Sequence, residues 1–252
     1  MDNFDKAAVE ISDVWKRFNI YQDRANSLKE KMIFWNRQRS EIFWALKKIN
    51  LIVQKGKTVG LIGRNGSGKS TLLKIISRIL YPTEGEVRVD GRMSTLLELG
   101  AGFHADFTGR ENIFLNASIL GFTRKEIKER LNDIITFAEL GDFIDNPVRN
   151  YSSGMYMRLG FAVAVHVDPD ILLIDEVLAV GDMAFQEKCI ARIRDLQNQG
   201  KTIILVTHAP KQIEDLCHLA VWLDHGEIRL SGPSREVAQA YTCFVEGNRE
   251  NN

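Results

Sequence analysis

Short apolar runs alternate with amphipathic helical patterns along much of the chain. Residues 171–174 and 202–206 are aliphatic runs short enough for buried strands, and residues 58–62 form a similar run earlier in the sequence. Between the two later runs, residues 183–199 repeat apolar positions at helical spacing and end at Gly200. Strands that alternate with helices in this way are typical of a parallel sheet, so we predict an α/β fold.

The N-terminal part shows a different pattern, because residues 9–18 alternate apolar and polar positions and residues 43–53 resume the strand pattern. Residues 21–40 break this alternation. In that segment Ser27 and Glu30 have the spacing of a capping box, and apolar residues recur at helical spacing, which predicts a short amphipathic helix. The alternative is a solvated amphipathic loop. The apolar positions of the predicted helix are Leu28, Met32 and Trp35.

A mostly helical block separates the early strands from the later ones. Residues 108–120 predict one helix, Thr123 and Glu126 begin a second with a capping box, and residues 152–167 predict a third. We therefore predict a single domain in which a helical subdomain is inserted. Its parts are an α/β core with an antiparallel β subdomain (1–97 and 168–245), the helical subdomain (98–167), the inserted segment (21–40) and a tail (246–252).

The segment after the first buried strand has the spacing GxxxxGK[ST]. Its glycines let backbone N–H groups turn inward around an anion, and the helix that follows adds the positive end of its dipole. Lys69 can then reach the outer phosphates of a nucleotide, and the Ser70 hydroxyl can hold Mg²⁺. The alternative is a glycine-rich turn that caps an ordinary helix. The candidate phosphate-binding residues are Gly63, Asn65, Gly66, Ser67, Gly68, Lys69, Ser70 and Thr71.

Polar residues follow the two later strands at their carboxyl ends, where ligands bind in open parallel sheets. Asp175 and Glu176 come directly after residues 171–174. We expect Asp175 to hold Mg²⁺ through water, and Glu176 to accept a proton from the water that attacks the γ-phosphate. His208 follows the next strand, so its ring is expected at the same site, bonded to the γ-phosphate or orienting Glu176.

Composition excludes several other classes of protein. Lys plus Arg and Asp plus Glu number 33 each, so no net charge attracts the chain to nucleic acid or to an anionic bilayer. The three cysteines are far apart and have no CxxC spacing, which argues against a disulfide framework or a zinc site. No apolar run approaches the ~20 residues of a membrane span, and the acidic N-terminus is unlike a signal peptide. We expect a cytoplasmic chain.

Residues 151–155 place small residues at the start of a predicted helix. Free N–H groups and a serine hydroxyl at such a terminus can bind an anion. The same residues can equally form an ordinary helix cap, and one phosphate does not need two helix termini from one chain. The sequence by itself leaves both interpretations open.

Taken together, these motifs resemble the nucleotide-binding subunit of ATP-binding cassette (ABC) transporters, over residues 9–245. The resemblance implies a P-loop NTPase fold with a RecA-like core, in which residues 151–155 replace the signature LSGGQ and residues 179–182 form the D-loop. It also implies that two copies face each other head to tail, so that the signature helix of one covers the ATP of the other. The residues that it adds to the nucleotide site are Ser152, Ser153, Gly154 and Asp182.

The chain also departs from the common pattern of that family. Ser153 stands where the signature has its first glycine, and Met155 where it has glutamine. The usual Q-loop glutamine is missing from residues 96–103, where Glu98 is the nearest polar residue and a candidate contact for Mg²⁺. The aromatic residue that stacks on adenine is either Phe18 or Tyr21, and Phe18 is our choice; a core position is the alternative for it.

These departures are similar to those in the ATPases that export lipid-linked bacterial polysaccharides, namely O-antigen, capsule and teichoic acid. Residues 151–155, 96–113 and 175–182 carry this narrower resemblance. In such proteins an insert between the first two strands forms a gate helix at the membrane face, and residues 21–40 match it in position. Phe34, Trp35 and the basic residues of the segment suit an acidic lipid head group or a permease.

The resemblance therefore predicts a homodimeric ATPase that uses ATP and Mg²⁺. It would act at the cytoplasmic face of the inner membrane, drive a separate membrane permease and export a lipid-linked glycan, with no nucleic acid as partner. A transport ATPase for another cargo is the first alternative. A soluble ABC protein of translation or DNA repair is the second, although the two cassettes or long coiled coil of such proteins are not visible. A P-loop GTPase would need an NKxD motif, which the chain lacks.

Overall fold

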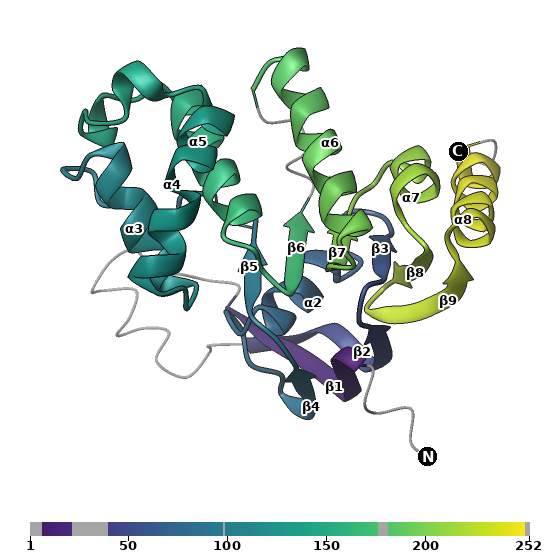
Figure 1. Cartoon of the computed structure of the whole chain (residues 1–252). Coiled ribbons are helices and arrows are strands. Elements are labelled where there is room, and N and C mark those ends of the chain that lie inside the picture. The colour runs from purple at the N-terminus through teal and green to yellow at the C-terminus, as the bar shows by residue number, and fades with distance from the viewer. Residues whose placement is uncertain (1–6, 22–39, 98, 176–180, 250–252) are drawn as a thin grey trace, which may run out of the picture.

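The computed structural model describes residues 7–21, 40–97, 99–175 and 181–249, and in this part of the chain the strands form two sheets (Figure 1). Six strands make the larger sheet, in the order β5-β6-β7-β3-β8-β9. Its first five strands are parallel and β9 is antiparallel to β8. The strands are β3 (Thr58–Ile62), β5 (Met93–Thr95), β6 (Ile171–Asp175), β7 (Thr202–Val206), β8 (Leu219–Asp224) and β9 (Glu227–Pro233).

The centre of this sheet is buried on both faces. Every residue of β3 and β7 is buried, as is all of β6 except Asp175. Such continuous apolar runs are what a parallel sheet covered on both sides requires. The helices that accompany the sheet are α2 (Lys69–Ile76), α6 (Met183–Asn198), α7 (Pro210–Leu216) and α8 (Ser234–Arg249).

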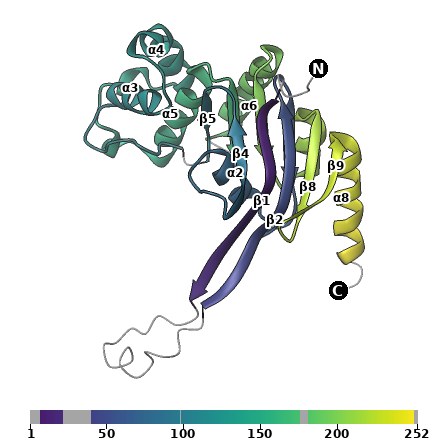
Figure 2. The same ribbon diagram turned by 90° about the horizontal axis from the view of Figure 1, so that it is seen from below.

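A separate antiparallel sheet has the strand order β2-β1-β4, formed by β1 (Ala7–Tyr21), β2 (Ser40–Gln54) and β4 (Glu84–Val89). The far ends of β1 and β2 project from the body of the protein as a two-stranded arm (Figure 2). Tyr21 pairs with Ser40 at the end of this arm, so both ends of the expected insert, residues 21–40, are strand. The expected gate helix itself falls at residues 22–39, outside the described part of the chain.

The helical part lies beside one end of the larger sheet and contains α3 (Gly109–Ile119), α4 (Arg124–Ala138) and α5 (Ser153–His166) (Figure 1). The predicted capping box of α4 is confirmed, because Thr123 accepts from the backbone N–H of Glu126 while the Glu126 carboxylate accepts from that of Thr123. Buried residues of α5, among them Phe161, join the same hydrophobic core as β6 and α6. The α/β fold with an antiparallel sheet and a helical insertion is therefore confirmed.

The final helix extends further than expected. The tail was predicted to begin at residue 246, but α8 continues to Arg249. The apolar face of this helix explains its length, because Tyr241 and Phe244 pack their rings against Trp222 of β8, with centroids 5.5 and 5.0 Å away. No helix in the described ranges is both long and apolar enough to cross a membrane.

Candidate functional site

The predicted phosphate loop lies between the buried strand β3 and helix α2. Gly66 and Gly68 have φ of 80° and 106°, in the left-handed region where a side chain is disfavoured. A Cβ atom on Gly63 would lie 2.2 Å from the backbone oxygen of Leu223, so only glycine fits there. The motif glycines thus let the backbone turn sharply against the neighbouring strand β8.

Lys69 begins α2 and is 5% exposed. Its Nζ donates to the backbone oxygens of Gly63 and Arg64, at 2.8 and 3.1 Å, so the ammonium group lies across the inside of the loop. Ser67 is also buried, and its Oγ has no hydrogen-bond partner among the described residues. A buried hydroxyl without a partner and an inward ammonium suit an anion of the size of a phosphate chain.

The back of the loop is held by residues distant in the sequence. Gly226, in the turn between β8 and β9, donates its N–H to the oxygen of Ser67, at 3.1 Å. The oxygen of Gly226 in turn accepts from the N–H of Lys47 in β2, at 2.7 Å. A Cβ on Gly68 would approach the oxygen of Ala45 to 2.7 Å. The loop is therefore fixed between both sheets before any ligand binds.

The sheet register places the other predicted groups along the same edge. Asp175 is the last residue of β6 and pairs with Val206 of β7, which pairs with Leu61 of β3. Asp175 is half-buried, whereas His208, two residues beyond β7, is exposed. The carboxyl ends of these three parallel strands thus bring Asp175 and His208 to the edge that carries the phosphate loop.

The metal site remains a prediction. Ser70, the first candidate ligand, is exposed at the start of α2. Within the described ranges no group of three or more His, Cys, Asp or Glu residues is placed to hold a metal ion. Ser70 and Asp175 are residues of the type that hold Mg²⁺ beside a phosphate chain, where the phosphates themselves supply ligands. Glu98 and the predicted general base Glu176 lie outside the described residues.

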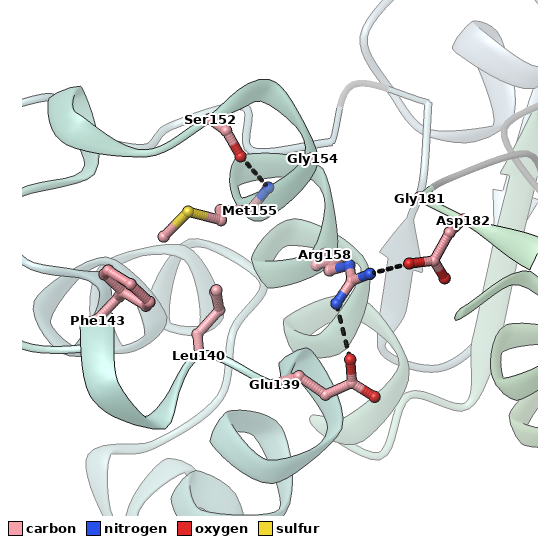
Figure 3. A pocket seen from close by; sticks show the side chains of 9 residues that line it. All are labelled: Glu139, Leu140, Phe143, Ser152, Gly154, Met155, Arg158, Gly181 and Asp182. Carbon is pink, nitrogen blue, oxygen red and sulfur yellow. Dashed lines mark hydrogen bonds and ion pairs between the residues drawn. The ribbon is translucent and has the colours of Figure 1, made fainter. Parts of the chain in front are cut away.

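The predicted signature segment begins helix α5. Ser152 is the N-cap, and its Oγ accepts from the N–H of Met155 at 3.2 Å. Ser152 and Ser153 are exposed and Gly154 is half-buried. A pocket of about 300 Å³ opens beside this helix end (Figure 3). Its lining residues are Glu139, Leu140, Phe143, Ser152, Gly154, Met155, Arg158, Gly181 and Asp182.

Two side chains that the sequence did not single out connect this helix to its surroundings. Tyr156 donates its hydroxyl to the oxygen of Gly100, at 2.9 Å, next to the expected Q-loop position. Arg158 pairs with Asp182, the last residue of the expected D-loop, at 2.8 Å. Asp182 also caps α6 by accepting from the N–H of Phe185. No spacing motif marks Tyr156 or Arg158, because their partners come from elsewhere in the chain.

Phe18 lies on the arm formed by β1 and β2. Its side chain is 36% exposed, and its residue pairs with Phe43 of β2. The Nζ of Lys16 lies 5.2 Å from the ring centroid, so one contact of the ring is a cation. A ring this exposed is accessible to a flat ligand, in contrast to the alternative of a core position. The side chain of Tyr21 is outside the described part.

One electrostatic effect extends from the loop to the last helix. Burial raises the pKa of the Tyr241 phenol on α8, the positive charge of Arg64 lowers it, and the nearby Asp224 raises it. Asp224 also pairs with Arg229 of β9 at 3.1 Å. Arg64 of the phosphate loop is therefore close enough to α8 to act on the charge of the Tyr241 phenol.

The chain is similar to known proteins over most of its length. A family model described as "ABC transporter" matches residues 46–179. The O-antigen export system ATP-binding protein RfbB of Myxococcus xanthus is 54% identical over 93% of this chain, which spans only 55% of that protein's length. A protein of the same name from Klebsiella pneumoniae is 44% identical over 92% of this chain and 96% of its own. The teichoic acids export ATP-binding protein TagH of Listeria monocytogenes serotype 4b is 44% identical over 94% of this chain and 70% of its own.

Solved structures agree on the fold. A dimeric ATP-binding cassette in a post-hydrolysis state, bound to ADP and Pi, superposes with a TM-score of 0.72 at 25% identity. The match covers 90% of this chain and 99% of that one. Residues 46–179, which the family model matches, contain both the phosphate loop and Asp175. The sheet register brings these two features to one edge of the sheet. The chain therefore belongs to the ABC transporter family.

Proposed function

We propose that this chain binds MgATP at the phosphate loop and hydrolyses it to drive the export of a lipid-linked polysaccharide through a separate membrane permease. The observation that carries the ATPase assignment is the single sheet edge at which β3, β6 and β7 present the phosphate loop, Asp175 and His208. A phosphate loop with a lysine and a serine, beside an aspartate that can hold a metal ion, has the groups that P-loop NTPases use for phosphoryl transfer.

Each residue of that edge has a defined part in the proposal. Lys69 and the backbone N–H groups of the loop would hold the phosphates. Ser70, and Asp175 through water, would hold Mg²⁺, which would supply positive charge beside the phosphates. Glu176 accepts the proton of the attacking water, and His208 bonds the γ-phosphate or orients Glu176. Phe18 stacks on adenine and Glu98 contacts the metal or its water, as the family resemblance implies.

A second copy of the chain completes the site in this proposal. The N-terminus of α5, with Ser152, Ser153 and Gly154, lies on a different element from the phosphate loop and begins with two exposed serines. Asp182, at the start of α6, borders the same pocket. We assign these groups to the ATP held by the partner copy. The similar solved cassette is dimeric, which supports a pair of copies, and the family resemblance implies that they face each other head to tail.

The cargo is inferred from the relatives. Proteins named for O-antigen export and for teichoic acids export are 44 to 54% identical over most of this chain. The family resemblance implies that such cargo is lipid-linked, so a lipid-linked glycan is our proposed class of cargo. The chain would then act as a peripheral subunit at the cytoplasmic face of the inner membrane. The inserted segment, residues 21–40, would contact the lipid head group or the permease.

The ATPase assignment is tested with Glu176→Gln. This variant should bind ATP, lose most of its turnover and accumulate as an ATP-bound dimer, because the amide cannot accept the proton. Turnover is measured by phosphate release, and the dimer by size-exclusion chromatography with MgATP. Turnover at the wild-type rate would remove Glu176 from its role as base.

The export assignment is tested in cells that lack the gene. The wild-type chain should restore surface polysaccharide, whereas a chain without residues 28–35 should keep ATP binding and fail to restore it. Unchanged export after that deletion would contradict the role of the inserted segment. A surface polysaccharide that is unaffected by loss of the gene would favour a transporter for another cargo.

A further inference from the structure

Two phenylalanines occupy opposite positions on the arm that β1 and β2 form (Figure 2). Phe18 of β1 pairs with Phe43 of β2, and the pairing is regular from Arg17 to Tyr21, so both side chains project from the same face of the arm. Phe18 is 36% exposed and Phe43 is 47% exposed. Neighbouring exposed apolar groups mark a binding surface more often than single ones do, so this pair of rings is a candidate contact for a ligand.

Strand β2 connects these rings to the phosphate loop. The register shifts by one residue between Lys16 and Arg17, which leaves Ala45 of β2 as a bulge, a feature that is common beside active sites. A Cβ on Gly68 would approach the oxygen of Ala45 to 2.7 Å, so the bulge lies against the loop. Phe43 is two residues from Ala45, ~7 Å along the strand. A ribose separates the phosphates of a nucleotide from its base, so the base of a nucleotide held by the loop can reach Phe43.

On β1, contacts with the segment that follows α2 fix the position of Phe18. The Nζ of Lys16 donates to the backbone oxygen of Tyr81 at 2.7 Å and lies 5.2 Å from the centroid of the Phe18 ring. The N–H of Arg17 donates to Oγ1 of Thr83 at 3.1 Å. The ammonium group occupies one side of the ring through a cation–π contact. The rest of the exposed ring surface is left for a flat ligand.

We propose that Phe43 is a base-binding residue and that, with Phe18, it forms a two-ring platform on which a purine base stacks. A purine has two fused rings and covers both phenylalanines, whereas the single ring of a pyrimidine covers only Phe18. Stacking uses the π-face that every base has, so the platform selects purines over pyrimidines by size and treats adenine and guanine alike. This inference rests on the proposed function, because it requires the phosphates in the loop and the base against Phe18.

Binding of nucleoside diphosphates tests the platform without interference from hydrolysis. ADP, GDP and CDP carry the same phosphates and differ in the base, so calorimetric titrations with Mg²⁺ isolate the contribution of the base to affinity. The wild-type chain should bind ADP and GDP with affinities within about threefold of each other, and CDP about tenfold more weakly, an effect of the size of one stacking contact.

Phe43→Leu keeps an apolar side chain but removes the ring, so it should weaken the binding of ADP and GDP about fivefold or more and leave that of CDP within about twofold. Phe43→Tyr keeps the ring and should retain the wild-type preference for purines. Ile42→Ala is the matched control, because Ile42 is 51% exposed on the same strand and, as the adjacent residue, projects from the opposite face of the arm. It should leave all three affinities unchanged.

Three results would overturn the platform: equal binding of ADP and CDP by the wild-type chain, unchanged ADP binding in Phe43→Leu, or an equal loss of ADP and CDP binding in that variant. The last result would mean that the ring shapes the arm and does not contact the base. Failure of the proposed function gives a different pattern, in which the wild-type chain binds none of the three nucleotides or binds them equally well after Lys69→Met. If Phe43→Leu does not fold, Phe43→Thr, which suits a strand and also lacks the ring, gives the same comparison.

Discussion

Helices α2 and α5 both have a small residue at the N-cap, yet their N-termini are built differently. At α2 the N-cap is Gly68 in the left-handed conformation, and it makes no side-chain cap hydrogen bond. At α5 the N-cap is Ser152, whose hydroxyl accepts from the N–H of Met155. The first terminus therefore leaves its N–H donors for a ligand, whereas the second already satisfies one of its own.

This difference indicates how the two ends divide the binding of one anion. The terminus of α2 is enclosed by the loop, with a buried lysine and a buried serine hydroxyl that has no partner among the described residues. The terminus of α5 has two exposed serines, and the hydroxyl of Ser152 already accepts a hydrogen bond from the helix. We infer that α2 provides most of the affinity for phosphate, and that α5 contributes only when a second copy brings it close.

The largest effect is expected from a substitution at the N-terminus of α2. Lys69→Met removes the ammonium group from inside the loop, so turnover should fall at least about 100-fold, as when one electrostatic donor is removed from an active site. Nucleotide binding by the single chain should fall with it. Phosphate release and fluorescent ATP titration measure the two quantities.

Lys57→Met is the control, because Lys57 is exposed at the opposite end of β3. It should retain wild-type binding and turnover. Equal losses in both variants would mean that general charge, rather than the loop, attracts the nucleotide.

A moderate effect is expected at the α5 side. Ser152→Ala should lower turnover about tenfold, the equivalent of one hydrogen bond to a charged group, while ATP binding by the single chain stays unchanged. It should also lower the free energy of unfolding by about 1 kcal/mol through loss of the cap. Thr108→Ala removes the cap of α3 and is the control, with a stability loss and normal turnover. A loss of monomer binding in Ser152→Ala would contradict the division of roles.

The smallest effect concerns a third helix terminus, that of α4, which has a complete capping box. Bonds from Arg92 first and Thr123 second lower the pKa of Glu126 from its usual 4.5 to about 2. A lowered carboxylate pKa stabilises the fold above pH 4.5, and that contribution is lost as the pH falls from 4.5 towards 2. Glu126→Gln keeps the capping box but removes the negative charge. Its free energy of unfolding should be lower than that of the wild type near pH 7, and the two values should converge towards pH 2.

Denaturant unfolding across this pH range measures the effect. Glu111→Gln, in the box of α3, is the comparison, because Thr108 is the main cause of its lowered pKa. Its difference from wild type should be smaller than that of Glu126→Gln. An equal difference would mean that Arg92 contributes nothing across the boundary between core and helical part.

Local signals in the sequence predicted much of this fold. The aliphatic runs of β6 and β7, the helix at residues 108–120 and the cap at Thr123 depend on neighbours in the chain, and the structure agrees with them. The phosphate loop was predicted for the same reason, since its glycines, lysine and serine are contiguous. Helix α7 and the short strand β5 were not predicted, because each has too few residues for a period to appear.

Contacts between distant segments could not be predicted in this way. The pairing of Arg158 with Glu139 and Asp182 joins three elements, and neither partner stands at a helical spacing from the arginine. The length of α8 depends on Trp222, which belongs to a strand. Strand β1 extends to Tyr21 and β2 begins at Ser40 because the two strands pair with each other there. The alternation of apolar and polar residues, which predicted the strands, is weaker in this part of the sequence.

The hydrogen bond between Gly226 and Ser67 has a consequence for folding during synthesis on the ribosome. Synthesis proceeds from the N-terminus, so the phosphate loop leaves the ribosome long before the turn that supports it. The loop gains this support only after residue 226 has been made and β8 has joined β3. A ribosome-bound chain truncated before β8 therefore carries the whole nucleotide motif without the hydrogen bond from Gly226, and it should bind ATP more weakly than the complete chain.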